Sequence, residues 1–133
     1  MDYIEYLIDG LEEDGYEYEV QENSDEAVVI LVEHSGVVVK ILCVGNFINL
    51  STILEDVEIS YSDCYGKKSD KRKERLNRLN LENEDYRFTN ELGTLIMERG
   101  IIMMVDYDKL IASKILLECL QLCMYCNWLR SEE

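Results

Sequence analysis

The sequence predicts an α+β fold in which an antiparallel sheet is packed by an N-terminal helix, a middle helix and a long C-terminal helix. Three segments carry apolar residues at helical spacing, and between them lie short alternating or β-branched runs separated by turn residues. Helices packed on an antiparallel sheet form a layered α+β domain. Because no repeat or linker divides the 133 residues, we expect a single domain over residues 1–133.

The N-terminal third predicts a helix followed by three strands. Residues 4–11 place apolar side chains at helical spacing opposite acidic ones, and Gly15 can end this helix. Residues 16–21 alternate between apolar and polar side chains, as in a half-exposed strand. The β-branched runs 27–32 and 37–44 flank a short turn and therefore predict a hairpin.

The middle of the chain predicts further strands and a helix. After the turn at Gly45, residues 47–50 form an apolar run that predicts a strand, and the alternation at 57–61 predicts another. Ser69 is a suitable N-cap for a helix over residues 70–81. The basic side chains of this helix are expected to form a stripe that faces solvent.

The C-terminal part predicts a second sheet segment and a long helix. Residues 86–88 alternate as in a strand. The segments 94–98 and 101–107 flank residues 99–100, which predicts two strands joined by a turn. The last helix is expected over Asp108–Leu129, with its first residue as the N-cap.

The last helix is apolar over well over half of its circumference. One apolar part comprises Ile111, Ala112, Ile115, Cys119, Leu122, Cys123 and Cys126. Another comprises Leu110, Leu117, Leu120, Met124 and Trp128. A helix that is apolar on more than one side is covered on more than one side. The sheet can cover one part, so the other implies a neighbouring helix or a second subunit, and we expect Leu117, Leu120, Met124 and Trp128 to bind a partner.

The charge distribution narrows the class of partner. The formal net charge is −15, from 28 acidic and 13 basic side chains. Residues 1–35 hold twelve acidic and no basic side chains, whereas residues 67–78 hold seven basic and two acidic ones. Because a negative potential repels phosphates and anionic lipids, we expect neither nucleic acid nor a membrane as partner. A nucleic-acid adaptor acting through Lys71, Arg75 and Arg78 is an alternative.

Three cysteines of the last helix suggest a second alternative. Cys119, Cys123 and Cys126 include a Cys-x-x-Cys pair, a spacing found in zinc-binding and thiol-redox proteins. Structural zinc needs a fourth ligand, and neither the other cysteines nor His34 has a suitable spacing. Free cysteine also packs as a small apolar residue. The sequence therefore favours core packing, with no metal or other cofactor, over a thiol-redox or zinc-binding protein.

No residue pattern in the sequence indicates an enzyme. The chain has one histidine and lacks a nucleophile motif, a phosphate-binding glycine loop and a zinc-protease motif. Five cysteines without framework spacing suit a reducing compartment, and the N-terminus has no signal-peptide pattern. Lys114 and Glu118 interrupt the most apolar stretch, which disfavours a membrane span. We therefore expect a cytoplasmic protein that is not an enzyme.

The order of motifs along the chain resembles the YbjN family. Two Leu-Asn pairs within residues 76–80 precede Tyr86-Arg87-Phe88, a turn that ends at Gly93, and a predicted hairpin to Met104. The N-terminal helix and the strand pair 27–44 also follow the family's order, so the resemblance covers nearly the whole chain. The chain differs from the family in lacking a proline before the middle helix and in its cysteine-rich last helix.

The resemblance implies a fold like that of the type III secretion chaperones, which are small, acidic, commonly dimeric proteins that bind other chains and catalyse nothing. It also implies a role as a bacterial sensory-transduction or stress regulator. It supplies no catalytic or ligand residues. Together with the two-sided last helix, it predicts a non-enzymatic, protein-binding regulator or chaperone-like adaptor that binds a protein partner or client and pairs as a homodimer.

Overall fold

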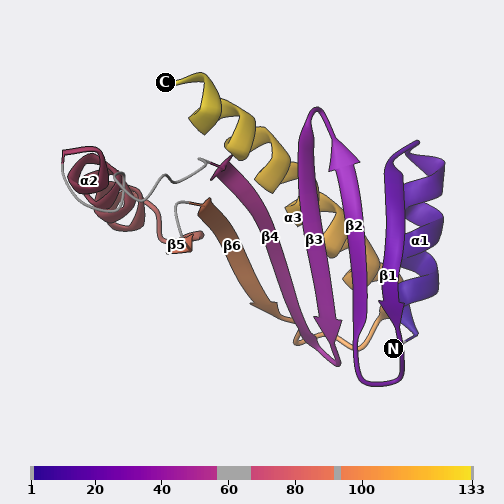
Figure 1. The fold of residues 1–133 in the computed structure, drawn as a ribbon. Helices are drawn as coiled ribbons and strands as arrows, with labels where there is room; N and C mark the ends of the chain where they lie inside the picture. The colour runs from indigo at the N-terminus through magenta and orange to yellow at the C-terminus, as the bar shows by residue number, and fades with distance from the viewer. Residues whose placement is uncertain (1, 57–66, 92–93, 133) are drawn as a thin grey trace.

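The computed structural model describes residues 2–56, 67–91 and 94–132. The helices and strands follow one another as α1 (Tyr3–Glu13), β1 (Glu17–Asn23), β2 (Val28–His34), β3 (Val37–Val44), β4 (Phe47–Asp56), α2 (Lys67–Glu82), β5 (Arg87–Glu91), β6 (Thr94–Ile102) and α3 (Asp108–Ser131) (Figure 1). The predicted α+β class and its three helices are confirmed.

The described strands form one antiparallel sheet in the order β1-β2-β3-β4-β6-β5. The expected second sheet segment is not separate, because β4 pairs with β6 from Phe47 opposite Ile102 to Asp56 opposite Thr94. Strand β4 therefore continues well beyond the predicted 47–50. The strand predicted at 57–61 lies outside the described residues.

The turn predicted at residues 99–100 is wrong. Strand β6 passes through both residues without a break, and Gly100 lies opposite Asn49 of β4 within the ladder. A Cβ atom on residue 100 would lie 3.4 Å from Cε2 of Phe47, so glycine here makes room for an aromatic ring of the neighbouring strand. The second predicted strand is wrong as well, because β6 ends at Ile102 and residues 103–107 lead into α3.

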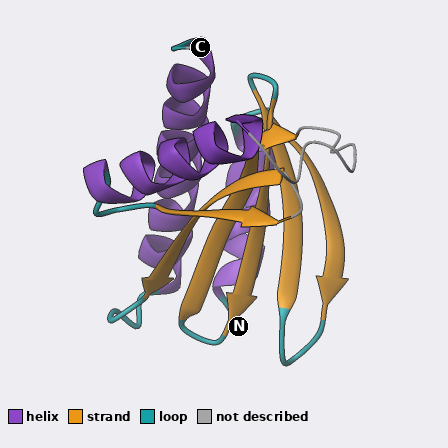
Figure 2. Ribbon diagram, turned by 60° about the vertical axis from the view of Figure 1, so that its left-hand side comes forward, coloured by secondary structure: helices purple, strands orange, loops and turns teal. Residues whose placement is uncertain are grey.

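Helices α1 and α3 lie side by side on one face of the sheet (Figures 1 and 2). Gly10 lies at their contact, because a Cβ atom there would lie 2.5 Å from Cδ1 of Leu116 and that side chain would have to move. The inward side chains of β2, β3 and β4 alternate with outward ones, as strand geometry requires. The fully buried core includes Leu7, Leu11, Ile30, Ile41, Ile48, Leu50, Met97, Ile115 and Leu122.

Helix α3 begins one residue earlier than the predicted cap implies. The carbonyl of Tyr107 accepts the amides of Leu110 and Ile111, so Tyr107 is the N-cap, and Asp108 lies in the first turn, where its charge suits the helix dipole. By length and composition, α3 is the one helix in the described part of the chain that could cross a membrane. Core helices share these properties, and here the first predicted apolar part of α3 is buried against the sheet.

Arg130 joins the C-terminal end of α3 to the sheet through three hydrogen bonds. Its Nε donates to the carbonyl of Leu54 (3.2 Å), Nη1 to Gly36 (3.1 Å) and Nη2 to Ile53 (2.8 Å). Asn127 adds a bond from Nδ2 to the carbonyl of Ser35 (3.1 Å). These acceptors lie in the β2–β3 turn and near the end of β4, so one side chain joins three separate segments.

Helix α2 stands at the β5 end of the sheet (Figure 1). It begins at Lys67, three residues before the prediction. Leu79 is buried, and the Asn80 amide binds both main-chain groups of Phe88, with Nδ2 donating to the carbonyl and Oδ1 accepting from the amide (both 2.9 Å). An ion pair between Arg75 and Glu55 of β4 holds another turn of the helix.

Candidate protein-binding surface

The outward side of α3 carries a row of exposed apolar side chains. Leu110, Leu117, Met124 and Trp128, here called the α3 strip, are between 51% and 64% exposed. Three of the four predicted partner-binding residues therefore lie on this strip. The fourth, Leu120, is half-buried. It follows Leu116 by one turn and so lies on the side of α3 that turns toward α1.

The α3 strip is free of acidic side chains. Between Asp108 and Glu132 the sequence contains one carboxylate, Glu118, and this residue is only 5% exposed. Lys109 lies over the Tyr6 ring of α1 at 5.6 Å, and Lys114 reaches Glu118. The exposed side of α3 itself, apart from its two ends, is thus neutral to basic in a chain whose net charge is −15.

Glu118 of α3 is a buried carboxylate with two cationic neighbours. Its Oε2 lies 3.2 Å from Nη1 of Arg99 on β6, and its Oε1 lies 3.5 Å from Nζ of Lys114. The Arg99 guanidinium also lies 6.0 Å from the centre of the Tyr86 ring. Oε2 makes no hydrogen bond of standard geometry within the described residues, so its burial depends on the neighbouring positive charges.

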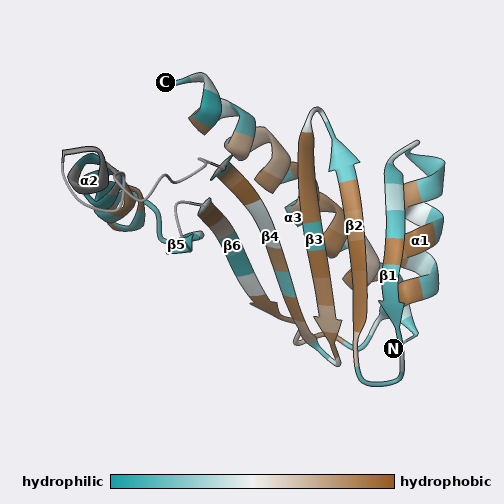
Figure 3. Cartoon of the chain, in the orientation of Figure 1, coloured by the Kyte–Doolittle hydropathy of each residue, from teal (hydrophilic) through white to brown (hydrophobic). Residues whose placement is uncertain are grey.

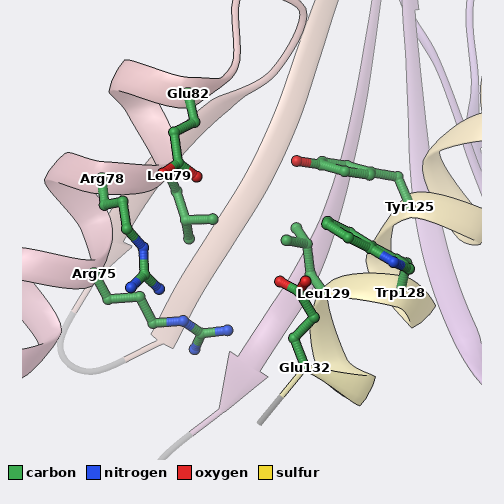
Figure 4. A pocket seen from close by; sticks show the side chains of 8 residues that line it. All are labelled: Arg75, Arg78, Leu79, Glu82, Tyr125, Trp128, Leu129 and Glu132. Atoms are coloured by element: carbon green, nitrogen blue, oxygen red, sulfur yellow. The ribbon is translucent and has the colours of Figure 1, made fainter.

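A cleft of about 730 Å³ separates α2 from the end of α3 (Figure 4). Its α3 wall is aromatic. The Tyr125 ring stacks on Tyr86 at 5.3 Å and on Trp128 at 5.7 Å, and the Tyr125 hydroxyl donates to Oδ1 of Asn83 (2.5 Å). Trp128 therefore belongs both to the α3 strip and to the cleft. Sequence reasoning missed Tyr86 and Tyr125, although Tyr125 and Trp128 are spaced to share one side of a helix.

The α2 wall of the cleft carries two arginines and one carboxylate, Glu82. Arg75 and Arg78 point into the cleft from successive turns (Figure 4). Arg75 pairs with Glu55, whereas Arg78 forms no ion pair with any described residue, although Glu74 is suitably spaced. Lys71 and Lys73 are exposed, and the side chains of residues 67–70 and 72 lie outside the described part. The nucleic-acid alternative stays untested.

The described cysteines are buried in the core. Burial raises the pKa of Cys43 to about 11, against a smaller lowering by the Tyr3 hydroxyl. The hydrogen bond with Cys123 and burial together raise the pKa of Cys119. Burial likewise raises the pKa of Cys126. Within the described ranges, no three His, Cys, Asp or Glu side chains are placed to hold a metal ion, so nothing in this arrangement favours the zinc alternative.

These raised pKa values predict unreactive thiols. At pH 8, iodoacetamide is expected to leave Cys43, Cys119 and Cys126 unmodified in the folded protein, because the thiolate is the reactive form. The hydrogen bond with Cys119 lowers the pKa of Cys123, but Cys123 is expected to stay unmodified because it is buried. In urea all four should react. Peptide mass spectrometry of the labelled protein measures each site separately. Rapid labelling of Cys119 or Cys123 in the folded state would instead indicate an activated thiol pair and favour the thiol-redox alternative.

Comparison with known proteins adds no family to this description. The chain matches no family model and no curated protein. The resemblance to the YbjN family thus stays a prediction.

Proposed function

We propose that this chain is a non-enzymatic protein-binding domain, of a regulatory or chaperone-like adaptor type, that pairs with a second copy of itself through the α3 strip. One observation carries the proposal: a row of large, exposed apolar side chains follows α3, the longest of the described helices, and is free of carboxylates in a chain of charge −15. Exposed apolar rows of this kind mark protein contacts. The resemblance to the YbjN family supports the regulatory role.

Charge explains why this surface suits a second copy. Two molecules that each carry −15 repel one another wherever their acidic surfaces meet. The α3 strip is a place where two copies can touch without opposing carboxylates. Completing the burial of one such half-exposed side chain stabilises a complex by about 1 kcal/mol. Leu117 lies near the middle of α3, so a two-fold axis there would place the same residues on both sides of the contact.

The test is the molar mass in solution. Light scattering over a range of concentrations should show twice the chain mass of 15.6 kDa. Leu117→Asp is expected to weaken pairing by about 100-fold, since two carboxylates would be buried near the axis. The emission of Trp128, the only tryptophan, should shift to longer wavelength in the same variant.

A matched control is Leu81→Asp. Leu81 is an equally apolar residue on α2 and is 86% exposed, so the same substitution there should leave the dimer unchanged. Leu120→Asp is a poorer choice, because Leu120 is half-buried and the change would also weaken the fold. A strict monomer at every concentration, or a dimer that survives Leu117→Asp, would contradict the proposal.

A further inference from the structure

The opposite face of the sheet is open. Figures 1 and 3 look onto this face, and no described helix covers it. Its outward side chains include Val38 of β3, Ile53 of β4 and Ile96 of β6. Ile53 and Ile96 are register partners across β4 and β6. Val38 and Ile53 are nearly half exposed, at 48% and 45%. A row of β-branched side chains therefore crosses three strands on this face.

A hollow of about 480 Å³ lies over this row and is called here the sheet hollow. Leu31, Val38, Ile53 and Ile96 form its apolar floor. Its charged side chains are Lys40 and Arg130, and no carboxylate lines it among the described residues. Sites for small ligands typically have this size, a largely apolar lining and a few polar groups that orient the ligand.

Neither cation of the sheet hollow has an acidic partner among the described residues. Lys40 lies in the centre of the face, between its register partners Leu31 and Ser51, and forms no ion pair with a described residue. Arg130 bonds to three main-chain carbonyls and to no described carboxylate. In a chain with 28 acidic and 13 basic side chains, two cations at one apolar, acid-free hollow are unusual.

Arg130 has more hydrogen-bond donors than its three bonds to main-chain carbonyls use. A guanidinium has five N–H groups. Three of them bind the carbonyls of Gly36, Ile53 and Leu54. Two N–H groups therefore stay available, and Lys40 contributes an ammonium group with up to three more donors. Such donors form strong charge-assisted hydrogen bonds with a carboxylate.

We propose that the sheet hollow binds a single-chain aliphatic carboxylate. The aliphatic chain lies across Val38, Ile53 and Ile96, and the carboxylate accepts hydrogen bonds from Lys40 and Arg130. The aliphatic chain of such a ligand matches the apolar floor, and its carboxylate matches the two basic side chains. The apolar floor of the site lies on the sheet face away from α3, and its one α3 residue, Arg130, is not part of the α3 strip. Ligand binding and self-pairing can therefore be tested independently.

Methyl NMR with decanoate, below its micelle concentration, tests the site. As decanoate is added, the chemical shifts of the methyl groups of Leu31, Val38, Ile53 and Ile96 are expected to change and then reach a plateau. Decanol has the same chain without the charge and should bind about tenfold or more weakly, as expected for the loss of a charged hydrogen bond. Equal binding of the two compounds, or shifts centred on Leu117 and Met124 of the α3 strip, would overturn the proposal.

Two pairs of variants separate the sheet hollow from the rest of the surface. Val38→Asp should abolish decanoate binding, whereas Val44→Asp, on the same strand at a similar exposure of 45%, should leave it unchanged. Lys40→Met should weaken binding about tenfold, whereas Lys73→Met, an exposed lysine of α2, should have no effect. Equal effects within either pair would overturn the assignment.

A third arm distinguishes a free amphiphile from a bilayer. Vesicles of phosphatidylglycerol should not sediment the protein, because its charge of −15 opposes an anionic membrane. Sedimentation with these vesicles in the absence of decanoate binding would show a membrane surface to be the ligand and would overturn the proposal.

Discussion

Replacing Arg99 with methionine is expected to lower the free energy of unfolding by about 2–4 kcal/mol. Glu118 is buried, and Arg99 is the nearer of its two cationic neighbours, at 3.2 Å against 3.5 Å for Lys114. Methionine fills a similar volume but leaves Glu118 with only Lys114, a partly exposed residue. Most of the cost therefore comes from a buried carboxylate with too little positive charge around it. Urea unfolding followed by circular dichroism measures the change.

Two controls isolate the charge effect. Arg87→Met removes an arginine whose side chain is 75% exposed and whose ion pair with Glu98 is long, at 3.8 Å. The free energy of unfolding should therefore change by no more than about 0.5 kcal/mol. The double variant Arg99→Met with Glu118→Leu should recover much of the loss, because it removes the buried carboxylate together with its partner. If the double variant is as unstable as the sum of both single changes, packing rather than charge sets the stability here.

Replacing Arg130 with methionine is expected to lower the free energy of unfolding by about 2–3 kcal/mol. The variant loses three hydrogen bonds from a charged donor to the carbonyls of Gly36, Ile53 and Leu54. Each carbonyl would then depend on solvent, and the end of α3 would lose its link to the β2–β3 turn. Urea unfolding gives the size of the effect, and hydrogen exchange of the last turn of α3 gives its location.

Arg130→Lys is the matched variant, since it keeps the charge but cannot reach three acceptors with one planar group. Its stability should fall between those of the wild-type protein and Arg130→Met. Equal stability of the lysine variant and the wild-type protein would show that charge near the helix end, rather than hydrogen bonding, holds α3 in place.

Much of the fold could be predicted because its signals are local. The hairpin of β2 and β3 followed from β-branched runs around a short turn, and Ser35 and Gly36 both adopt the positive φ that such a turn uses. The turn expected at residues 99–100 was wrong for a non-local reason. Gly100 commonly signals a break, but here it accommodates the Phe47 ring of a strand that is distant in sequence.

The candidate protein-binding surface also combines features that local sequence predicts with features that only tertiary contacts determine. Helical periodicity alone placed Leu117, Met124 and Trp128 on the outward side of α3, because spacing along a helix determines which residues share a side. The half-burial of Leu120 depends on the packing of α1, whose Gly10 lies at the contact. No local pattern contains that contact, since more than 100 positions separate the two helices' meeting residues, Gly10 and Leu116.

The sequence by itself determined the α+β class, the three helices, the two-sided character of α3 and the charge that makes its acid-free side notable. Each of these depends on periodicity or composition, which are properties of neighbouring residues. Only the tertiary structure decided how the strands join into one sheet, which charges are buried, and that Lys40 and Arg130 both line one hollow. Such juxtapositions arise from strand pairing and helix packing across long stretches of chain, so they become visible only when those stretches are brought together.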